Sequence, residues 1–533
     1  MEMSIYGSSR EPLKHNPIVV MMGSDTLFAR TNGAVTLGVD GMLVDVEVDV
    51  SYGLPSFDIV GLLDTAVKES KERVRTAVKN SGFKLKQSKV TINLAPANIR
   101  KDSSGLDLPI AAGLLAAYGM VSQERIDKCL FAAEMSLEGE LRPVTGVLPM
   151  VIAAREKGMK EVFVAPANAN EALLVDGIAV YAPGTLSQMI AFLNGTEELS
   201  PTEKTELQED VEPCEDFADV EGQFQAKRAL EIAAAGGHNV LMAGVPGAGK
   251  TMLARRLSSI LPPLSREEAL EVTKIYSIAG LLKPGSGLIT KRPFRAPHHT
   301  TSAVAMIGGG SIPHPGEVTL SHRGVLFLDE LPEFSKTTLE VLRQPLEDGH
   351  VTISRVHASL QFPSQMILVT AMNPCPCGWH GDETHDCTCS PGEIRRYTRK
   401  ISGPLLDRID IHIRVPRVAY KELVSTQKAE PSSKIRKRVV AARAIQMERF
   451  KDQHIYCNGQ MRHALLRRCC KLTEGAQQLM KLAFEKMDLS ARSYDRILKV
   501  SRTIADLDHS ENIEDRHVAE AIQLRNDVGL DIA

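Results

Sequence analysis

An eight-residue run at positions 244–251, GVPGAGKT, carries the clearest chemistry in the sequence. It fits the pattern G-x-x-x-x-G-K-[ST] without a mismatch, and the glycines of this pattern let backbone N–H groups wrap around phosphates. The lysine of the pattern reaches the β- and γ-phosphates, and its hydroxyl residue holds Mg²⁺. The run therefore predicts a site for a nucleoside triphosphate and Mg²⁺. The predicted binding residues are Gly244, Val245, Pro246, Gly247, Ala248, Gly249, Lys250 and Thr251.

The sequence on either side of this run supports the same interpretation. An apolar stretch over residues 239–243 is typical of a short buried strand, and residues 252–257 follow with a helical pattern. A chance glycine-rich turn does not require a strand before it and a helix after it, whereas a phosphate loop does.

Two more apolar runs end in polar side chains that suit a nucleotide site. Residues 325–328 end in Asp329 and Glu330, and residues 366–371 are followed by Asn373. Ligands bind at the carboxyl ends of parallel strands. We expect Asp329 to hold the Mg²⁺ shell, Glu330 to orient and deprotonate the attacking water, and Asn373 to hold that water or the γ-phosphate. The alternative for Asn373 is a cap on a strand-to-loop turn.

Four cysteines form a separate cluster with paired spacing. Two C-x-C pairs are separated by nine residues, and His380 and His385 lie between them. Four thiolates at such spacing suit tetrahedral Zn²⁺, although C-x-C is less usual than C-x₂-C. The alternatives are free buried thiols or an oxidised cluster. The predicted zinc ligands are Cys375, Cys377, Cys387 and Cys389.

Length and composition limit the class of protein. The 533 residues are too many for one core, so two to four domains are expected. No apolar run reaches the roughly 20 residues that span a bilayer, which predicts no membrane partner. Nine cysteines without a disulfide framework fit a reduced cytoplasm. Residues 1–24 are expected to be a disordered extension, or sequence upstream of the true start.

Charge is distributed unevenly along the chain. Residues 195–221 carry 11 Asp and Glu against one Lys, which predicts a solvated linker. Residues 391–470 carry 19 Lys and Arg against 7 Asp and Glu. That excess fits either a solvated helical face or a surface that meets phosphates or a neighbouring subunit.

Hydrophobic periodicity predicts the main elements. The block at residues 25–194 mixes strands with helices, so we expect an α/β or α+β domain. Residues 430–533 show helical patterns without strands. Predicted strands cover 44–50, 90–94, 162–164 and 178–180, and predicted helices cover 64–80, 108–118, 223–235, 435–450, 475–488, 493–506 and 514–524.

The first block resembles the Lon-protease domain. KDSSGLDLPIAAGLLAA at 101–117 resembles the segment that carries the nucleophilic serine, and residues 139–172 look like the final part of that fold. A Ser–Lys dyad needs a serine on one segment and a lysine on the other. On this pattern the two positions fall at about Gly105 and Leu148, and neither residue can do the chemistry. The resemblance therefore implies an inactive accessory domain, although Ser103 and Ser104 lie close by.

Two arginines match segments of known ATPases. SGPLLDRID at 402–410 resembles the arginine-finger segment of AAA+ ATPases in the magnesium-chelatase and replicative-helicase branch, with Arg408 as the finger. The alternative is a local ion pair with Asp407 or Asp410. LSARSY at 489–494 resembles the second sensor of the same branch, with Arg492 as the sensor; its alternative is a solvent-facing arginine. A finger stabilises charge on the phosphoryl group in a neighbouring subunit, which implies a ring.

The resemblance extends over about 25–530, to the YifB/ComM family of bacterial AAA+ ATPases. Its most specific parts are PFRAPHHTTSAVAMIGGGSIPHPGEVTLSHRGVLFLDELPEF at 293–334 and NPCPCG at 373–378. It implies ATP and Mg²⁺ as cofactors, a homo-oligomer that is a hexamer, and a DNA motor of the helicase or branch-migration type. The alternatives are a metal-chelatase motor subunit or an ATP-driven protein remodeller.

Two insertions would contact DNA if the resemblance holds. One is the segment 283–316, with Lys283, Lys291, Arg292 and Arg295. The other is a predicted β-hairpin at 350–363, with Arg355 and His357 near its tip. Basic residues facing a pore would bind phosphates without sequence preference, whereas an ordinary surface hairpin is the alternative.

The expected architecture is α/β throughout most of the chain. It comprises a disordered extension (1–24), an inactive Lon-protease-like domain (25–194), an acidic linker (195–221), an AAA+ parallel-sheet core of the magnesium-chelatase type (222–425) and a small all-helical C-terminal lid (430–533).

Overall fold

The computed structural model shows two compact units, residues 1–206 with 283–287 and residues 207–282 with 288–533. The described residues are 28–62, 64–99, 101, 103–204, 215–283, 285, 287–310, 313–355, 358–382, 384–418, 429–453, 455–487 and 489–526. The extension expected at 1–24 lies outside them, as does the central part of the acidic linker.

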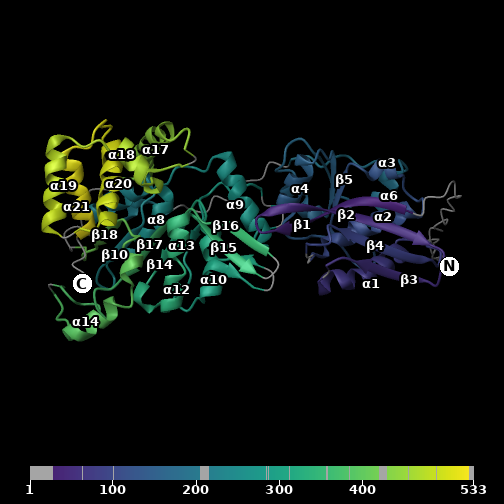
Figure 1. Cartoon of the computed structure of the whole chain (residues 1–533), viewed down its shortest axis with the longest axis horizontal. Helices are drawn as coiled ribbons and strands as arrows, with labels where there is room; N and C mark the ends of the chain where they lie inside the picture. The colour runs from purple at the N-terminus through teal and green to yellow at the C-terminus, as the bar shows by residue number, and fades with distance from the viewer. Residues whose placement is uncertain are drawn as a thin grey trace, which may run out of the picture. The chain divides into compact units, whose positions relative to one another are not determined.

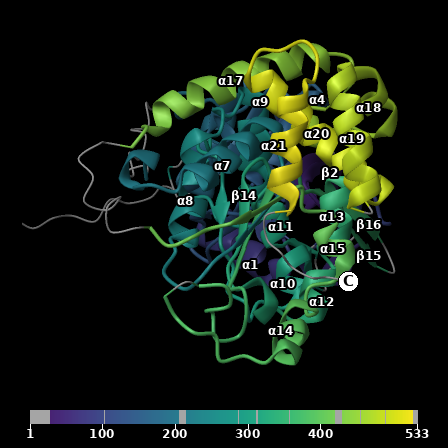
Figure 2. The same ribbon diagram turned by 90° about the vertical axis from the view of Figure 1, so that its left-hand side faces the viewer.

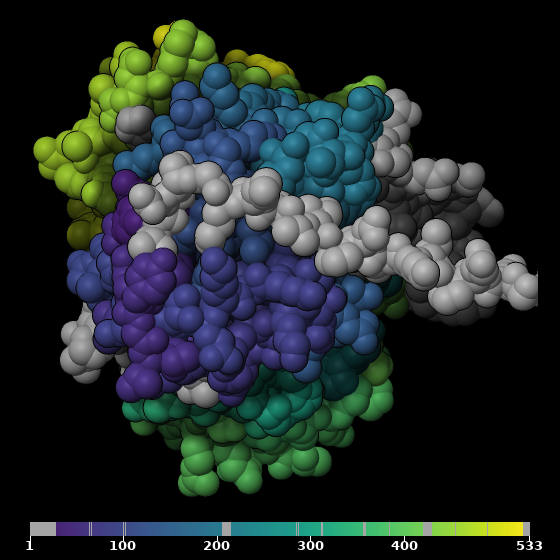
Figure 3. Space-filling model, turned by 90° about the vertical axis from the view of Figure 1, so that its right-hand side faces the viewer, coloured from purple at the N-terminus to yellow at the C-terminus, as the bar shows by residue number. Residues whose placement is uncertain are grey.

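The first unit is built on one seven-stranded mixed sheet (Figure 1), and Figure 3 shows part of the surface of this unit in purple and blue. Its order is β3-β4-β2-β1-β5-β8-β9, in which β2 pairs antiparallel with β1 and β4 and the other pairs are parallel. The alternate valines predicted at 44–50 all face the core. The strands are β1 (Phe28–Leu37), β2 (Asp40–Ser51), β3 (Ser56–Val60), β4 (Lys89–Ala95), β5 (Cys129–Ala132), β8 (Glu161–Val164) and β9 (Ala179–Tyr181), with a separate pair β6 (Glu134–Met135) and β7 (Leu141–Arg142).

Helices cover this sheet, and the sequence of each helix explains how much of it is buried. Every residue of α2 is buried because the helix is apolar on all sides. α1 is amphipathic and is followed by Gly82 at φ 90°, a left-handed value that glycine adopts without strain. The helices are α1 (Thr65–Asn80), α2 (Asp107–Ala117), α3 (Gln123–Ile126), α4 (Val147–Glu156), α5 (Ala169–Ala172) and α6 (Leu186–Leu193).

The second unit contains a five-stranded parallel sheet. Its order is β11-β14-β17-β10-β18, so all its carboxyl ends share one edge. The parallel sheet predicted from the three apolar runs is confirmed. The strands are β10 (Val240–Ala243), β11 (Phe294–Arg295), β14 (Val325–Leu328), β17 (Ile367–Met372) and β18 (Ile411–Arg414), and the helices that follow or precede them are α7 (Phe224–Gly236), α8 (Lys250–Ile260) and α9 (Arg266–Ile278).

The C-terminal helices pack on this sheet domain through a continuous apolar core. Val240 and Leu253 belong to the same buried cluster as Val439 and Ile504. Figure 2 shows α18 to α21 grouped together, with α17 running from them toward α8. The helices are α17 (Ser432–Arg449), α18 (His463–Cys469), α19 (Glu474–Lys486), α20 (Ala491–Leu507) and α21 (Asp515–Asn526).

Short elements decorate the edges of the sheet. The predicted hairpin at 350–363 is confirmed as β15 (His350–Arg355) and β16 (Ala358–Pro363). The other short elements are α10 (Ala303–Ile307), β12 (Gly308–Gly309), β13 (His314–Pro315), α11 (Glu317–Leu320), α12 (Lys336–Glu340), α13 (Arg343–Asp348), α14 (Pro391–Thr398) and α15 (Gly403–Leu406).

Most elements predicted from periodicity are present. The elements that the sequence patterns did not predict include the strands β1, β3, β5, β11 and β18 and the helices α6, α9, α14 and α18. β18 has four residues, too few to show an alternation. No helix in the described part of the chain has both the length and the apolar character that a membrane crossing needs.

Candidate nucleotide site

The phosphate loop, residues 244–251, joins the end of β10 to the start of α8. Gly247 and Gly249 have φ values of 75° and 85°, which favour glycine. A Cβ on Gly244 would lie 2.3 Å from the Val415 carbonyl oxygen, so the loop is packed directly against the chain after β18. The three glycines are therefore required by backbone geometry as well as by phosphate access.

Lys250 is buried at the start of α8 and is held by three oxygens. Its Nζ donates to the carbonyls of Gly244 (2.6 Å) and Val245 (3.0 Å) and to Asn373 Oδ1 (3.0 Å). Burial lowers the pKa of Lys250, while Asp329 and Glu330 act in the opposite direction. The structure thus brings Asn373 from the end of β17 to the predicted phosphate-binding lysine.

Thr251 and Asp329 lie together as a pair of oxygen ligands. The Thr251 hydroxyl donates to Asp329 Oδ2 at 2.7 Å, and the Glu330 backbone N–H donates to the other carboxylate oxygen at 2.9 Å. A hydroxyl and a carboxylate beside a phosphate loop are the hard ligands that Mg²⁺ takes in such sites. These residues fit the predicted metal.

Glu330 occupies a backbone conformation that is unusual for a side chain of its type. Its φ of 51° is left-handed, which costs of order 1 kcal/mol in a residue other than glycine. Its carboxylate is more than half exposed, and Oε2 lies 3.5 Å from Nδ1 of His299. The sequence reasoning missed His299; its signal was the His298–His299 pair inside the run that carries the family resemblance.

Arg408 lies at the opposite edge of the sheet from the phosphate loop. It precedes β18, whose four residues at about 3.3 Å each put roughly 13 Å of strand between the two edges. Its guanidinium donates to the Pro404 carbonyl at 2.7 Å and pairs with Glu347, while its buried Nε has no hydrogen-bond partner among the described residues. The ion pair is thus made with Glu347, a residue that sequence reasoning missed, rather than with Asp407 or Asp410.

Arg492 lies in the first turn of α20 and is exposed. Together with Arg408 it lines a cleft of about 750 Å³ at the amino ends of the strands, where Asn239 precedes β10 and Met366 precedes β17. The two arginines predicted as finger and sensor therefore share one cleft, which is remote from the phosphate loop of the same subunit.

A buried polar network anchors the wall of this cleft. Asp410 is 5 % exposed and binds His238 Nδ1 at 3.3 Å, the Asn239 backbone N–H at 3.3 Å, and Arg496 of α20. Against the effect of burial, Arg496 and His238 hold the pKa of Asp410 far below its usual range. Asp410 therefore links the start of β18 to the C-terminal helices through its ion pair with Arg496.

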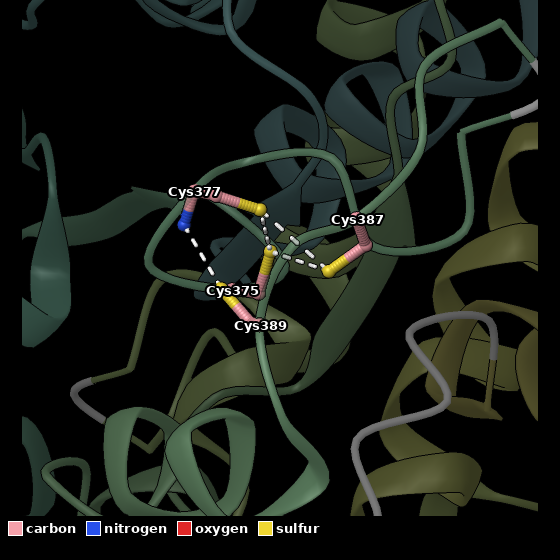
Figure 4. Close-up of side chains that lie close together, drawn as sticks. All are labelled: Cys375, Cys377, Cys387 and Cys389. Atoms are coloured by element: carbon pink, nitrogen blue, oxygen red, sulfur yellow. Dashed lines mark hydrogen bonds between the residues drawn. The ribbon is translucent and has the colours of Figure 1, made fainter.

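The four cysteines of the predicted zinc cluster converge (Figure 4). All four sulfurs lie within 4.8 Å of one another, and those of Cys375, Cys377 and Cys387 are 3.3, 3.6 and 3.7 Å apart. Four Zn–S bonds of about 2.3 Å in a tetrahedron place the sulfurs about 3.8 Å apart. The donor set is compatible with a structural zinc ion.

The cysteine loop, residues 374–390, rests on the phosphate loop. A Cβ on Gly378 would meet Pro246 Cγ at 2.7 Å. The Trp379 ring stacks on His385, with centroids 4.4 Å apart, and Arg417 lies over the same ring at 4.9 Å. His385 therefore packs against Trp379 and bonds to Asp382 rather than joining the sulfurs.

The predicted DNA-contacting residues have different positions. The side chains of Arg355 and His357 lie outside the described residues. Arg292 donates to the carbonyls of Pro262 and Arg323 and to Glu268, and Arg295 makes two bonds to Glu317. These two arginines therefore hold their own domain together, and neither is free to face phosphates.

The two positions that the Lon resemblance predicts for a Ser–Lys dyad hold Gly105 and Leu148. Gly105 lies in a 3₁₀ turn beside Val144, which its Cβ would meet at 3.5 Å. Leu148 is buried in α4, and its backbone N–H donates to Glu171. The hydroxyl of Ser103 caps the turn by accepting from the Gly105 N–H.

Family models match three stretches of the chain. Models described as magnesium chelatase, subunit ChlI, match residues 216–423 and, for its C-terminal part, 429–525, and one described as subunit ChlI of Mg-chelatase matches 46–168. The first unit therefore also matches a model that is named for a chelatase subunit.

Several curated proteins are similar over most or part of the chain. Competence protein ComM of Haemophilus influenzae is 44% identical over 92% of this chain and 96% of its own length. Uncharacterized protein YifB of Escherichia coli is 42% identical over 92% and 95%. Lon protease 2 of Bacillus subtilis is 27% identical over 36% of each chain.

Proposed function

The chain belongs to the YifB/ComM family of magnesium-chelatase-like AAA+ proteins, and from this we propose that it is an ATP-hydrolysing, ring-forming motor that acts on DNA. The expected actions are helicase activity and branch migration, in recombination and in the uptake of DNA during natural transformation. The competence named in the H. influenzae relative agrees with the second setting.

We assign each residue at the carboxyl edge of the sheet a separate role in ATP hydrolysis. Lys250 would leave its carbonyl partners to bind the β- and γ-phosphates, and Asn373 would hold the attacking water. Mg²⁺ held by Thr251 and Asp329 would neutralise charge on the same phosphates. Glu330 is the general base, because it is the remaining carboxylate at this edge and is open to solvent.

The proposal of a ring rests on the position of Arg408 and Arg492, which line a cleft at the amino ends of the strands. A cation that stabilises the transferred phosphoryl group must contact it, so these two arginines must serve the nucleotide of another subunit. A closed ring gives every subunit such a neighbour. We infer a hexamer from the family.

DNA as the partner draws support from a group of four exposed cations, three of which make no ion pair in the described part of the chain. Helix α14 and the two residues after it expose Arg395, Arg396, Arg399 and Lys400, and only Lys400 reaches a carboxylate among the described residues, at 3.4 Å from Glu333. Such a surface would bind phosphates in a salt-dependent, sequence-independent way. The β15–β16 hairpin remains the second candidate contact.

The test is ATP hydrolysis measured without DNA and with single-stranded, duplex and branched DNA. Lys250→Ala and Glu330→Gln serve as inactive controls. Stimulation by at least one DNA form is expected, and hydrolysis indifferent to all of them would contradict the motor. Strand exchange on a labelled four-way junction then tests branch migration directly.

Two alternative functions use the same core. A metal-chelatase motor subunit is favoured by the names of the family models, and an ATP-driven protein remodeller is consistent with the accessory first unit. ATP-dependent metal insertion into a porphyrin would support the first, and ATP-dependent unfolding of a tagged substrate the second; either one without DNA stimulation would replace the proposed function.

The remaining assignments follow the same proposal. Residues 25–194 are an inactive Lon-like domain because Gly105 and Leu148 cannot form a dyad, which a casein-cleavage assay tests. Residues 195–221 serve as a linker, residues 222–425 form the ATPase core and residues 430–533 act as its lid. A cytoplasmic location is proposed because the sequence has nine cysteines without a disulfide framework.

A structural zinc ion in the cysteine cluster is the last part of the proposal. Zn²⁺ would clamp residues 375–389 between the end of β17 and α14. Elemental analysis of protein purified without chelator should find about one zinc per chain, and less than about 0.2 would exclude the ion.

A further inference from the structure

The main chain of Arg408 is fixed by hydrogen bonds to its surroundings. Asn239, just before β10, donates from Nδ2 to the Arg408 carbonyl at 3.0 Å, and its Oδ1 accepts from the Leu368 N–H at 2.9 Å. The Arg408 N–H donates to the Leu405 carbonyl at 2.9 Å. The sheet therefore sets the position of the backbone at Arg408, and only the direction of its long side chain remains to be set.

Helix α13 contacts the segment that carries Arg408 at two points. Arg343 and Glu347 are four residues apart, so they lie on the same face of this helix. Arg343 donates from Nη2 to Ser402 Oγ at 3.0 Å, and Glu347 accepts from Nη2 of Arg408. Ser402 is the N-cap of α15, and Arg408 lies two residues after its last residue. One face of α13 therefore holds both ends of the short segment around α15.

Helix α13 is itself fixed at its C-terminal end. The Gly349 N–H donates to the Pro345 carbonyl at 3.0 Å, and Gly349 has a left-handed φ of 72° that ends the helix. The Gly349 carbonyl accepts from the Ser364 N–H at 2.9 Å, which closes the base of the β15–β16 hairpin. Glu347 therefore stands on a helix that is anchored to its neighbours, and it is placed to hold another side chain in one direction.

The contacts of the Arg408 guanidinium leave donors free for a phosphoryl group. Nη1 donates to the Pro404 carbonyl and Nη2 donates to Glu347. Each of these nitrogens carries two hydrogens, so one N–H on each remains for another acceptor. Neither Arg408 nor Glu347 makes a second ion pair among the described residues. The contact with Glu347 therefore restrains the guanidinium without using up its donors.

We propose that Glu347 is a positioning residue that sets the direction in which Arg408 reaches the nucleotide of a neighbouring subunit. The inference rests on the proposed ring, in which Arg408 is the finger. An arginine that is already oriented loses less conformational freedom when it contacts the transferring phosphoryl group. Without the carboxylate, the side chain of Arg408 samples other rotamers, and fewer encounters place its free N–H groups on that phosphoryl group.

The test compares Glu347→Ala with the unaltered chain in steady-state ATP hydrolysis, with and without single-stranded DNA. The kcat should fall about tenfold through loss of orientation, less than the roughly 10³-fold expected for Arg408→Ala. The KM for ATP should stay unchanged, because Lys250 and Thr251 are intact. Glu347→Gln keeps an acceptor oxygen and should restore most of the rate. Glu347 is more than half exposed, so the variant should fold, which urea unfolding checks.

Asp348→Ala is the matched control for the loss of charge. Asp348 is the next residue of α13, is exposed and makes no ion pair in the described part of the chain, so its removal should leave kcat unchanged. An equal fall in both variants would assign the effect to charge in this region and overturn the inference. A kcat of Glu347→Ala at or above that of the unaltered chain would overturn it as well.

Mixing subunits shows whether Glu347 acts on the neighbour's nucleotide. A Lys250→Ala subunit is inactive itself but keeps Glu347 and Arg408, so adding it to Glu347→Ala should raise the rate per Glu347→Ala subunit. No rise would mean that Glu347 acts within its own subunit, against the inference. If Arg408→Ala leaves kcat unchanged, the proposed finger fails and the inference fails with it. If Arg408→Ala lowers kcat and Glu347→Ala does not, the inference alone fails.

Discussion

The two ends of the parallel strands in the second unit are organised in different ways. We call the side where the strands end the carboxyl edge and the side where they begin the amino edge. At the carboxyl edge, Lys250, Thr251, Asp329 and Asn373 already contact one another. At the amino edge, Arg408 and Arg492 line a cleft without contacting any group at the carboxyl edge. At one edge the predicted nucleotide-binding residues lie together, whereas the other presents two arginines that are remote from them. In the proposed ring, each subunit would supply half of a catalytic site.

The largest effect on ATP hydrolysis should come from inactivating each edge in a separate variant and then mixing the two variants. Arg408→Ala should lower kcat by roughly 10³-fold while leaving ATP binding intact, because the finger acts only on the transferring phosphoryl group. Lys250→Ala should abolish hydrolysis through loss of binding. Mixing the two inactive proteins should restore part of the rate, since mixed rings contain interfaces with one intact Lys250 and one intact Arg408. A mixture as inactive as its components would show that the edges do not cooperate between subunits.

A second test weakens the amino edge without touching either arginine. Asp410→Asn leaves buried His238 and Arg496 without their counter-charge, which should lower the free energy of unfolding by about 3 kcal/mol. Urea unfolding measures this, with Asp407→Asn as a matched control on the neighbouring, less buried carboxylate. Equal stability of the two variants would mean that the network does not hold the helices to the sheet.

A third test concerns the carboxyl edge and its cysteine loop. Cys387→Ser should lower the zinc content and weaken ATP binding about tenfold, equivalent to roughly 1.4 kcal/mol, because Gly378 would no longer support Pro246. Elemental analysis and titration with a fluorescent ATP analogue give the two readouts. Cys469→Ser, at the end of α18, is the control. Zinc loss with unchanged ATP affinity would separate the cluster from the nucleotide site.

The smallest expected effect is a pH dependence of stability, which comes from Glu271 near the amino edge. Burial works to raise the pKa of Glu271, but hydrogen bonds from His322 and Arg323 lower it to about 2. A carboxyl with a depressed pKa stabilises the fold above its unfolded value of 4.5, and this contribution disappears as pH falls toward 2. Glu271 is about half exposed, so Glu271→Gln should cost less than about 1 kcal/mol at pH 7. The stability difference from the unaltered chain should vanish in acid; a difference that persists at pH 2 would assign it to packing.

Local patterns sufficed for the carboxyl edge. A phosphate loop, two carboxylates and an asparagine each follow an apolar run, and parallel strands bring such ends together. The amino edge was harder to predict, because its contacts join distant positions such as Arg408 with Glu347. The same is true of the contact between Glu330 and His299 at the carboxyl edge. No sequence pattern near Arg408 or Glu330 identifies these partners. Short strands such as β18 were missed for a related reason, since their pairing rather than their pattern defines them.

Strand β18 has a mechanical consequence. Arg408, the proposed arginine finger, lies three residues before it, and just past its last residue the Val415 carbonyl packs against Gly244 of the phosphate loop. Because β18 is paired with β10 along its whole length, we expect it to move as a rigid connection between these two points. In the proposed ring, a shift of the loop during nucleotide exchange would then be passed to the arginine that serves a neighbouring nucleotide. Turnover in one subunit would in this way affect the timing of the next.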